Sequence, residues 1–458
     1  MSNLDAVLSQ IDENLDASVD RLFDFLRIQS ISTDPAFKNH CQQAADWLAN
    51  ELGSIGFDAN REDTPGHPMV VAKGGTGDKH YLFYGHYDVQ PVDPLELWTS
   101  DPFDPQKEET ANGVVIRARG AADDKGQLMT FVEACRAFKQ VHGELPAKLT
   151  LFFEGEEESG SPSLVPFMQS NRERLKADLA MVCDTGMWDT NTPSISTMLR
   201  GMVGGEITIT GPDRDLHSGM YGGPAMNPIR VLTRILSDLH DDNGRITLPN
   251  FYDGVDPLPA DIKQQWDSLN HDDQGFLQDV GLSVPAGEKD ASVLEQIWAR
   301  PSCDINGIVG GYTGEGFKTV LPSQAMAKVS FRLVGRQDPL AIEASFKEFI
   351  ESRLPEDCTV SYVFKNGSAA TVMPVDAPVF GKAQQALSDE WPNKAVYAGC
   401  GGSIPVVGHI KDILDMDSLL IGFGLEDDAI HSPNEKYDLR SFHKGIRSWA
   451  RVLAALAE

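Results

Sequence analysis

The chain lacks several features that would assign it to a common protein class. Its six cysteines are scattered over 458 residues without a C-x-x-C pair, so neither a disulfide framework nor a thiolate metal site is expected. No stretch approaches the roughly 18 consecutive apolar residues of a membrane span. The polar segment from Met1 to Asp5 has no apolar signal core. We therefore expect a cytoplasmic protein without a membrane segment.

Positive charge is also scarce. The chain has 39 Lys and Arg residues against 68 Asp and Glu residues, which gives a formal net charge of −29. This charge argues against nucleic acids and anionic membranes as partners. Phosphate-binding motifs of the GxGxxG and P-loop kinds are missing, and so are motifs for serine or cysteine nucleophiles. Nucleotide binding and covalent hydrolysis are therefore not indicated.

The pattern of apolar residues indicates two domains. A chain of 458 residues, 41% of them hydrophobic, is too long for one ordinary core. Apolar runs that alternate with helical patterns predict an α/β domain, whose mostly parallel sheet carries helices on both faces. Within it we expect one amphipathic helix over residues 4–28 and a long loop over residues 90–113.

A segment of different texture interrupts this domain. Without the acidic stretch 241–300, its expected elements follow the order β-α-β-β-α-β, which is typical of a ferredoxin-like unit. The sequence therefore predicts an α+β domain over residues 198–375. It would be inserted into a larger domain that is formed by residues 1–197 and 376–458.

Four expected strands each lead into a histidine or an acidic residue. These strands cover residues 81–84, 149–153, 179–183 and 419–423. The polar residues that follow them are His86, Asp88, Glu156, Glu157, Glu158, Asp184 and His431. Functional groups gather beyond the carboxyl ends of parallel strands, and histidines with carboxylates suit divalent metals that take nitrogen and oxygen ligands.

Each of these features also has a simpler interpretation. The His86 and Asp88 pair could lie in solvent, the glutamate run could be a solvated surface, and Asp123 with Asp124 could cap the helix that follows them. The recurrence of such groups at four strand ends favours a metal site over these separate explanations.

Several motifs together resemble a known enzyme family. They are Gly85-His86-Tyr87-Asp88-Val89, the segment from Gly120 to Gly126, Glu156-Glu157-Glu158-Ser159-Gly160, and the segment around His431. Nearly end to end, the chain resembles the co-catalytic metallopeptidases: carnosine and other cytosolic dipeptidases, glutamate carboxypeptidases, aminoacylase, acetylornithine deacetylase and succinyl-diaminopimelate desuccinylase. Residues 215–219 and 401–405 place it nearest the dipeptidase branch.

The resemblance implies a zinc-exopeptidase-like catalytic domain with two divalent metal ions, zinc in preference to manganese. The ligands that it implies are His86, Asp123, Glu158, Asp184 and His431. Asp123 would bridge the two ions, His86 and Asp184 would complete the ligands of one ion, and Glu158 and His431 those of the other. The peptide bond between Asp123 and Asp124 would be cis.

The remaining site residues are also implied by the resemblance. Three residues would form the catalytic set. Asp88 would orient His86, Glu157 would be the general base, and His217 would donate a hydrogen bond to the oxyanion. The substrate would contact Thr319, Arg332 and Ser403, with Arg332 holding its α-carboxylate. His217 would act in trans, in a homodimer built through the inserted lid domain.

The expected activity is metal-dependent hydrolysis of dipeptides or similar short amides with a free carboxylate. An alternative is a deacylase of N-acyl amino acids, which would use the same metals and a different pocket. A metal-binding protein without catalysis is a third hypothesis, which the presence of Glu157 disfavours.

Overall fold

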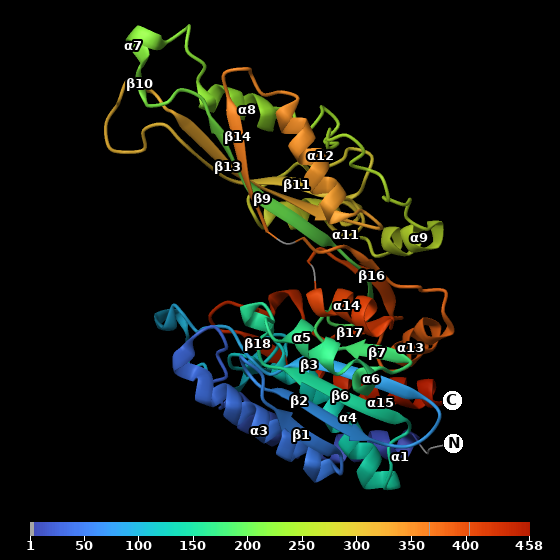
Figure 1. Cartoon of the computed structure of the whole chain (residues 1–458). Coiled ribbons are helices and arrows are strands. Elements are labelled where there is room, and N and C mark those ends of the chain that lie inside the picture. Colours follow the sequence, from blue (N-terminus) through green and yellow to red (C-terminus); the bar gives the residue numbers. More distant parts are fainter. Residues whose placement is uncertain (1–3, 366, 403) are drawn as a thin grey trace. The chain divides into compact units, whose positions relative to one another are not determined.

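The computed structural model describes residues 4–365, 367–402 and 404–458. It divides into two compact units (Figure 1). The larger unit contains the described residues of Met1–Thr197, Met373–Ala398 and His409–Glu458, and the smaller unit those of Met198–Val372 and Gly399–Gly408. The expected domains instead assigned residues 399–408 to the larger part. Of the four boundaries between the units, two fall within strands, β8 (Ser194–Leu199) and β16 (Val396–Cys400), one falls within the helix α14 (Pro405–His409), and one directly follows β15 (Thr371–Val372), so no linker composition marks them.

A nine-stranded sheet has the order β1-β2-β6-β3-β7-β17-β8-β15, with β16 paired to β8. Most of its strands belong to the larger unit, whereas β15 belongs to the smaller one. The other strands of this sheet are β1 (Asp58–Glu62), β2 (Met69–Gly74), β3 (His80–His86), β6 (Lys148–Glu154), β7 (Leu179–Val182), β15 (Thr371–Val372) and β17 (Ser418–Ile421). The four central strands β6, β3, β7 and β17 are parallel, and the flanking pairs are antiparallel. The expected parallel core is confirmed, within a mixed sheet.

Aromatic contacts show that helices cover both faces of this sheet. Phe152 of β6 stacks on Phe167 of α5 (Leu164–Ser170), with ring centroids 5.6 Å apart. Side chains that alternate along a strand point to opposite faces. On the other face, Phe83 of β3 contacts Phe131 of α4 (Lys125–His142) at 3.8 Å and Trp449 of α15 (Leu439–Ala457) at 5.7 Å. This arrangement confirms the predicted α/β layers.

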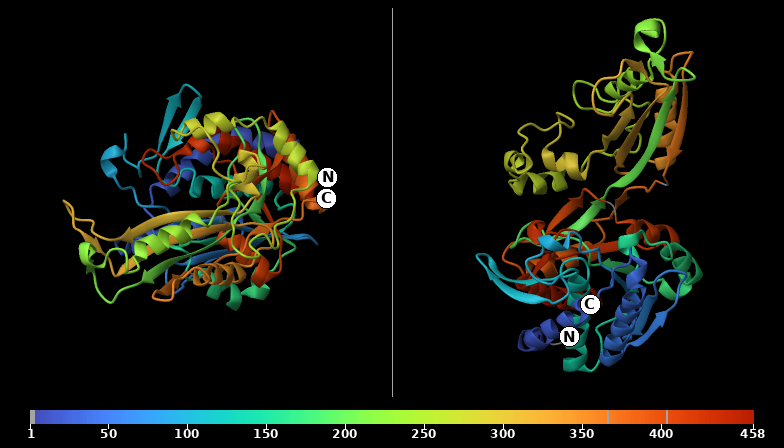
Figure 2. Two further views of the ribbon diagram at one scale, coloured as in Figure 1. Left: turned by 90° about the horizontal axis from the view of Figure 1, so that it is seen from above. Right: turned by 90° about the vertical axis from the view of Figure 1, so that its left-hand side faces the viewer.

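The remaining helices of the larger unit surround these layers. They are α1 (Leu4–Glu13), α2 (Leu15–Leu26), α3 (Lys38–Ile55), α6 (Arg172–Leu175) and α13 (Pro378–Ser388), with a π-helical turn at Ile410–Leu414. The N-terminal α1 packs against the C-terminal α15, and both views in Figure 2 show the two ends close together. Among the described residues, no helix combines the length and apolar character needed to cross a bilayer.

Two local expectations were wrong. The expected helix over residues 4–28 is broken at Asn14, whose side-chain amide donates to the carbonyl of Gln10 at 2.8 Å and competes with the helical hydrogen bonds. The expected loop over residues 90–113 contains β4 (Gln106–Thr110), which pairs with β5 (Gly113–Arg117). The polar, exposed sequence of β4 gave no strand signal.

The smaller unit has the expected β-α-β-β-α-β order. Its elements are β9 (Gly201–Thr210), α8 (Pro228–Ser237), β11 (Ser302–Gly310), β13 (Gln324–Leu333), α12 (Pro339–Glu351) and β14 (Thr359–Phe364). The antiparallel sheet has the order β11-β13-β9-β14, and its core includes buried residues of both helices. The stretch 241–300 adds α9 (Ala260–Ser268), α10 (Asp273–Gln278) and α11 (Val293–Trp298). Two short strands, β10 (Leu216–His217) and β12 (Val320–Leu321), form an antiparallel pair. The short helix α7 (Ser218–Tyr221) directly follows β10 in the chain.

Candidate dinuclear metal centre

The carboxyl ends of the four parallel strands bring together five side chains that are far apart in the sequence. His86 is the last residue of β3, and Asp184 follows β7. Glu158 lies in a 3-10 turn after β6, and His431 lies in the loop after β17. Asp123 precedes α4. We call these five residues the metal cluster.

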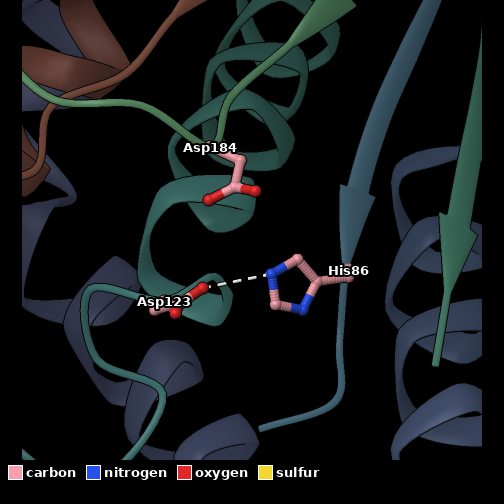
Figure 3. Close-up of side chains that lie close together, drawn as sticks. All are labelled: His86, Asp123 and Asp184. Carbon is pink, nitrogen blue, oxygen red and sulfur yellow. Dashed lines mark hydrogen bonds and ion pairs between the residues drawn. The ribbon is translucent and has the colours of Figure 1, made fainter. Parts of the chain in front are cut away.

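The metal cluster contains two groups that share one residue. Ligand atoms of His86, Asp123 and Asp184 lie within 4.8 Å of one another, and so do those of Asp123, Glu158 and His431. Oδ1 of Asp123 lies 3.1 Å from Nε2 of His86, whereas Oδ2 lies 2.9 Å from Nε2 of His431. One carboxylate therefore faces an imidazole on each side. Figure 3 shows His86, Asp123 and Asp184 pointing toward one another from three different segments.

The electrostatics of the metal cluster favour a cation within it. Burial and the negative charge of Asp123 raise the pKa of Asp184 to about 7, against the effect of His86. Hydrogen bonds to Asp123 and Glu158 raise the pKa of His431 to about 10. The carboxylates thus crowd negative charge into a buried space, and two imidazole nitrogens face them. Two histidines and three carboxylates are a fitting donor set for zinc or manganese.

Asp88 connects the end of β3 with the glutamate turn. Its Oδ1 accepts from the backbone N–H of Glu157 at 3.3 Å, and its Oδ2 accepts from that of Glu158 at 3.1 Å. Nδ1 of His86 lies 3.2 Å from the backbone oxygen of Asp88 and 3.4 Å from Oδ1. A partner on the second ring nitrogen fixes the tautomer and orientation of a ligating histidine.

The three consecutive glutamates have three different surroundings. Glu158 belongs to the metal cluster. Glu156 turns away, because its carboxylate accepts from the backbone N–H groups of His67 at 2.7 Å and Ser163 at 2.8 Å. The Glu157 carboxylate has no hydrogen-bond or ion-pair partner among the described residues. Burial, together with Glu158, Asp88 and Asp123, raises its pKa, although His86 acts in the opposite direction.

Three of the other predicted site residues, His217, Thr319 and Arg332, belong to the smaller unit. His217 is exposed, and its Nδ1 accepts from the backbone N–H of Gly219 at 3.0 Å, which leaves the ring proton on Nε2. Thr319 is exposed, and its carbonyl accepts from the N–H of Ser218 at 3.1 Å. Arg332 is half-buried on β13. Ser403 lies outside the described residues.

The structure adds contacts that the sequence analysis missed. Nε2 of Gln90 donates to Glu158 at 2.7 Å. Oδ2 of Asp124 accepts from the backbone N–H of His86 at 3.1 Å, and the peptide bond between Asp123 and Asp124 is cis, as the resemblance implied. In the sequence, only the position of Asp124 beside Asp123 indicated that Asp124 contributes to the site. No sequence pattern marked Gln90, because its partner lies far away in the chain.

A third acidic group is already neutralised by the protein. Asp427, Asp428 and Asp438 come close together, but Nζ of Lys436 lies 2.9, 2.7 and 3.1 Å from their respective oxygens. The ammonium group occupies the place that a metal ion would need. These aspartates therefore hold the loop between β17 and β18 (Lys436–Asp438) rather than a cation.

Comparison with known proteins decides the family. The model of peptidase family M20/M25/M40 matches residues 82–455. The chain belongs to this family. A Cys-Gly metallodipeptidase of Candida albicans is 30% identical, with 97% of this chain and 96% of the relative covered. The human Beta-Ala-His dipeptidase is 26% identical, with coverages of 99% and 93%.

A solved structure agrees with this assignment. An M20 family metallo-carboxypeptidase from Sulfolobus solfataricus has a TM-score of 0.81 and 28% identity, with 96% of this chain and 99% of that chain covered. Together with the Cys-Gly and Beta-Ala-His dipeptidases among the relatives, this match confirms the resemblance to the dipeptidase branch of the M20 family. Membership in this family of metallopeptidases implies that the chain binds divalent metal ions, for which the metal cluster provides suitable ligands.

Proposed function

We propose that the protein is a dinuclear metallodipeptidase that hydrolyses dipeptides or similar short amides with a free carboxylate. The observation that carries this proposal is the position of Asp123 between two histidine–carboxylate groups, with the nearby carboxylate of Glu157 left without a partner among the described residues. The relatives named as Cys-Gly and Beta-Ala-His dipeptidases support the choice of substrate class.

In this proposal the metal cluster would hold two ions, zinc in preference to manganese, and Asp123 would be a ligand of both. His86 and Asp184 would complete one site, and Glu158 and His431 would complete the other. When bound, such ions polarise a carbonyl group and make a nearby water molecule more acidic. The protein's own histidines and carboxylates set where those ions lie.

Glu157 is the general base in this mechanism. Its carboxylate has no hydrogen-bond or ion-pair partner among the described residues, and it lies outside both groups of the metal cluster. It takes a proton from the attacking water and donates it to the leaving amine. The guanidinium of Arg332 binds the carboxylate of the substrate, because the planar fork of the guanidinium matches a carboxylate. Thr319 and Ser403 are further substrate contacts.

His217 completes the site from the partner subunit of a homodimer. Its Nδ1 is an acceptor in the contact with Gly219, so the Nε2–H group is free to donate to the developing oxyanion. The edge strand β11 of the smaller unit exposes Ile305, Ile308 and Val309, with exposed fractions of 43%, 54% and 57%. Exposed apolar side chains along a sheet edge are typical of an interaction surface.

The buried cysteines support a reducing compartment. Five of them, Cys41, Cys135, Cys183, Cys303 and Cys358, form no disulfide, as is typical of cytoplasmic proteins. We place the enzyme in the cytoplasm on this basis. Cell fractionation with an antibody against the protein tests this placement, and recovery in a secreted or membrane fraction would contradict it.

The activity is tested with purified protein that has been stripped with a chelator and reloaded with zinc or manganese. We expect hydrolysis across a panel of dipeptides, with loss of activity after stripping and recovery after reloading. N-acetyl amino acids form the second arm of the assay. Faster turnover of these compounds than of any dipeptide would favour the deacylase, and no turnover of either class would refute the proposed function.

A further inference from the structure

Glu435 is a buried carboxylate to which the sequence analysis gave no role. Its side chain is fully buried, and four N–H groups donate to it. Oε1 accepts from the backbone N–H groups of Ala122 at 2.9 Å and Asp123 at 3.1 Å. Oε2 accepts from the backbone N–H of Gly120 at 3.0 Å and from Nη1 of Arg119 at 2.7 Å. One side chain thereby fixes most of the loop that precedes α4.

This carboxylate connects two loops of the metal cluster. Glu435 lies four residues after His431, and its partners run up to Asp123. The backbone contributes as well, because the N–H of Ala118 donates to the carbonyl of Glu435 at 3.2 Å. Nη1 of Arg117 donates to the carbonyl of Asn434 at 2.6 Å. The loops that carry Asp123 and His431 are therefore joined by direct hydrogen bonds.

We infer that Glu435 is a positioning residue, which sets the affinity of the metal cluster for both of its ions. Asp123 belongs to both groups of the metal cluster. A shift of its backbone displaces one oxygen from His86 and the other from His431, so both sites are affected together. This inference rests on the metal site of the proposed function.

The substitution Glu435→Gln tests the inference with little change in volume. The amide keeps one acceptor oxygen, but its NH2 group would face two N–H donors, so two of the four hydrogen bonds are lost. A matched control is Glu390→Gln, whose charged partners all lie on α15 and not in the loops of the metal cluster. Glu390 is also buried and accepts from Arg447 and Arg451 at 2.8 Å and from Lys444 at 3.0 Å.

The measurement is a titration of metal-free protein with cobalt(II), followed by the visible absorption of the bound ion. For Glu435→Gln we expect the affinity for both ions to fall by about 10- to 100-fold, as for other residues that orient ligands. Glu390→Gln should stay within about twofold of the wild type, because distant sites act independently. Glu435→Asp, which keeps the charge but is shorter, should fall between the wild type and the amide variant.

The outcomes separate this inference from the proposed function. A folded Glu435→Gln protein with wild-type cobalt affinity and spectrum would overturn the inference, and so would an equal loss in Glu390→Gln. If Glu435→Gln does not fold, Glu435→Asp decides in the same way. A wild type that binds cobalt but hydrolyses no dipeptide would refute the proposed function alone.

Discussion

Replacing Glu157 by Gln should remove catalysis and leave the metal ions in place. The carboxylate of Glu157 lies outside both groups of the metal cluster, and its backbone N–H bond to Asp88 does not depend on the side chain. A general base contributes about 10²- to 10⁴-fold to a rate, which corresponds to about 3–5 kcal/mol of barrier. We expect kcat for a dipeptide to fall by this factor, with the metal content unchanged.

The same substitution has a predicted sign for stability. In the metal-free protein, burial raises the pKa of Glu157 above its usual value of 4.5. The ionised group therefore opposes folding at neutral pH, and this effect disappears below the usual pKa, where the carboxyl is protonated in both states. Metal-free Glu157→Gln should be at least as stable as the wild type at pH 7, and the two should converge as the pH falls below that value.

The assay measures kcat, metal content by elemental analysis and the unfolding midpoint on the same preparations. Glu158→Gln is the matched control, since the neighbouring side chain belongs to the metal cluster and its loss should release an ion. Glu157→Gln with full metal and more than about a tenth of the wild-type kcat would refute the role of the base, because such a loss is below the range for general bases. Loss of metal from Glu157→Gln, with retention in Glu158→Gln, would show that the two roles are exchanged.

Three further predictions follow from the structure. Asp123→Asn should weaken the binding of both ions in a metal titration, and by more than the roughly 10- to 100-fold loss that is typical when a residue only orients a ligand. Loss of a single ion would contradict the shared position of Asp123. Mixing His217→Ala with Glu157→Gln subunits should restore about a quarter of the wild-type activity, because half of the dimers would be mixed and each would hold one intact site; no recovery would exclude the action of His217 in trans. Burial alone would raise the pKa of Glu390, but hydrogen bonds from three cations outweigh it and hold the pKa below its usual value. Glu390→Gln should therefore lower the free energy of unfolding by about 1–3 kcal/mol at pH 7, with the difference lost as the pH falls through the folded-state pKa, and a constant difference in pH-dependent denaturant unfolding would refute this account.

Much of the fold could be read from apolar patterns. The runs at residues 81–84 and 149–153 are buried on both faces of the sheet, so each gives an uninterrupted signal. Polar strands gave none, and β1 (Asp58–Glu62) was missed because its side chains are partly or fully exposed. The break at Asn14 was also missed, because the helical spacing of apolar residues continues on both sides of it.

For the site, too, the sequence predicted some features and the structure supplied the others. The residue types and their positions after strands were sufficient to select His86, Asp184 and His431, because parallel strands end at a common edge. The distinction between Glu156 and Glu158 depended on the resemblance, and the structure supplies a physical basis. Glu156 satisfies two backbone N–H groups of other segments, whereas Glu158 faces His431.

The sequence by itself determined which groups are available for chemistry and which end of a strand they follow, because apolar runs and the residues after them are local properties of the chain. Tertiary structure alone decided that the two oxygens of Asp123 face different imidazoles and that Glu435 holds the loop before it. Those contacts join residues that are separated by up to 316 positions. Hydrogen bonds over such separations depend on how the loops fold together, and no local pattern records them.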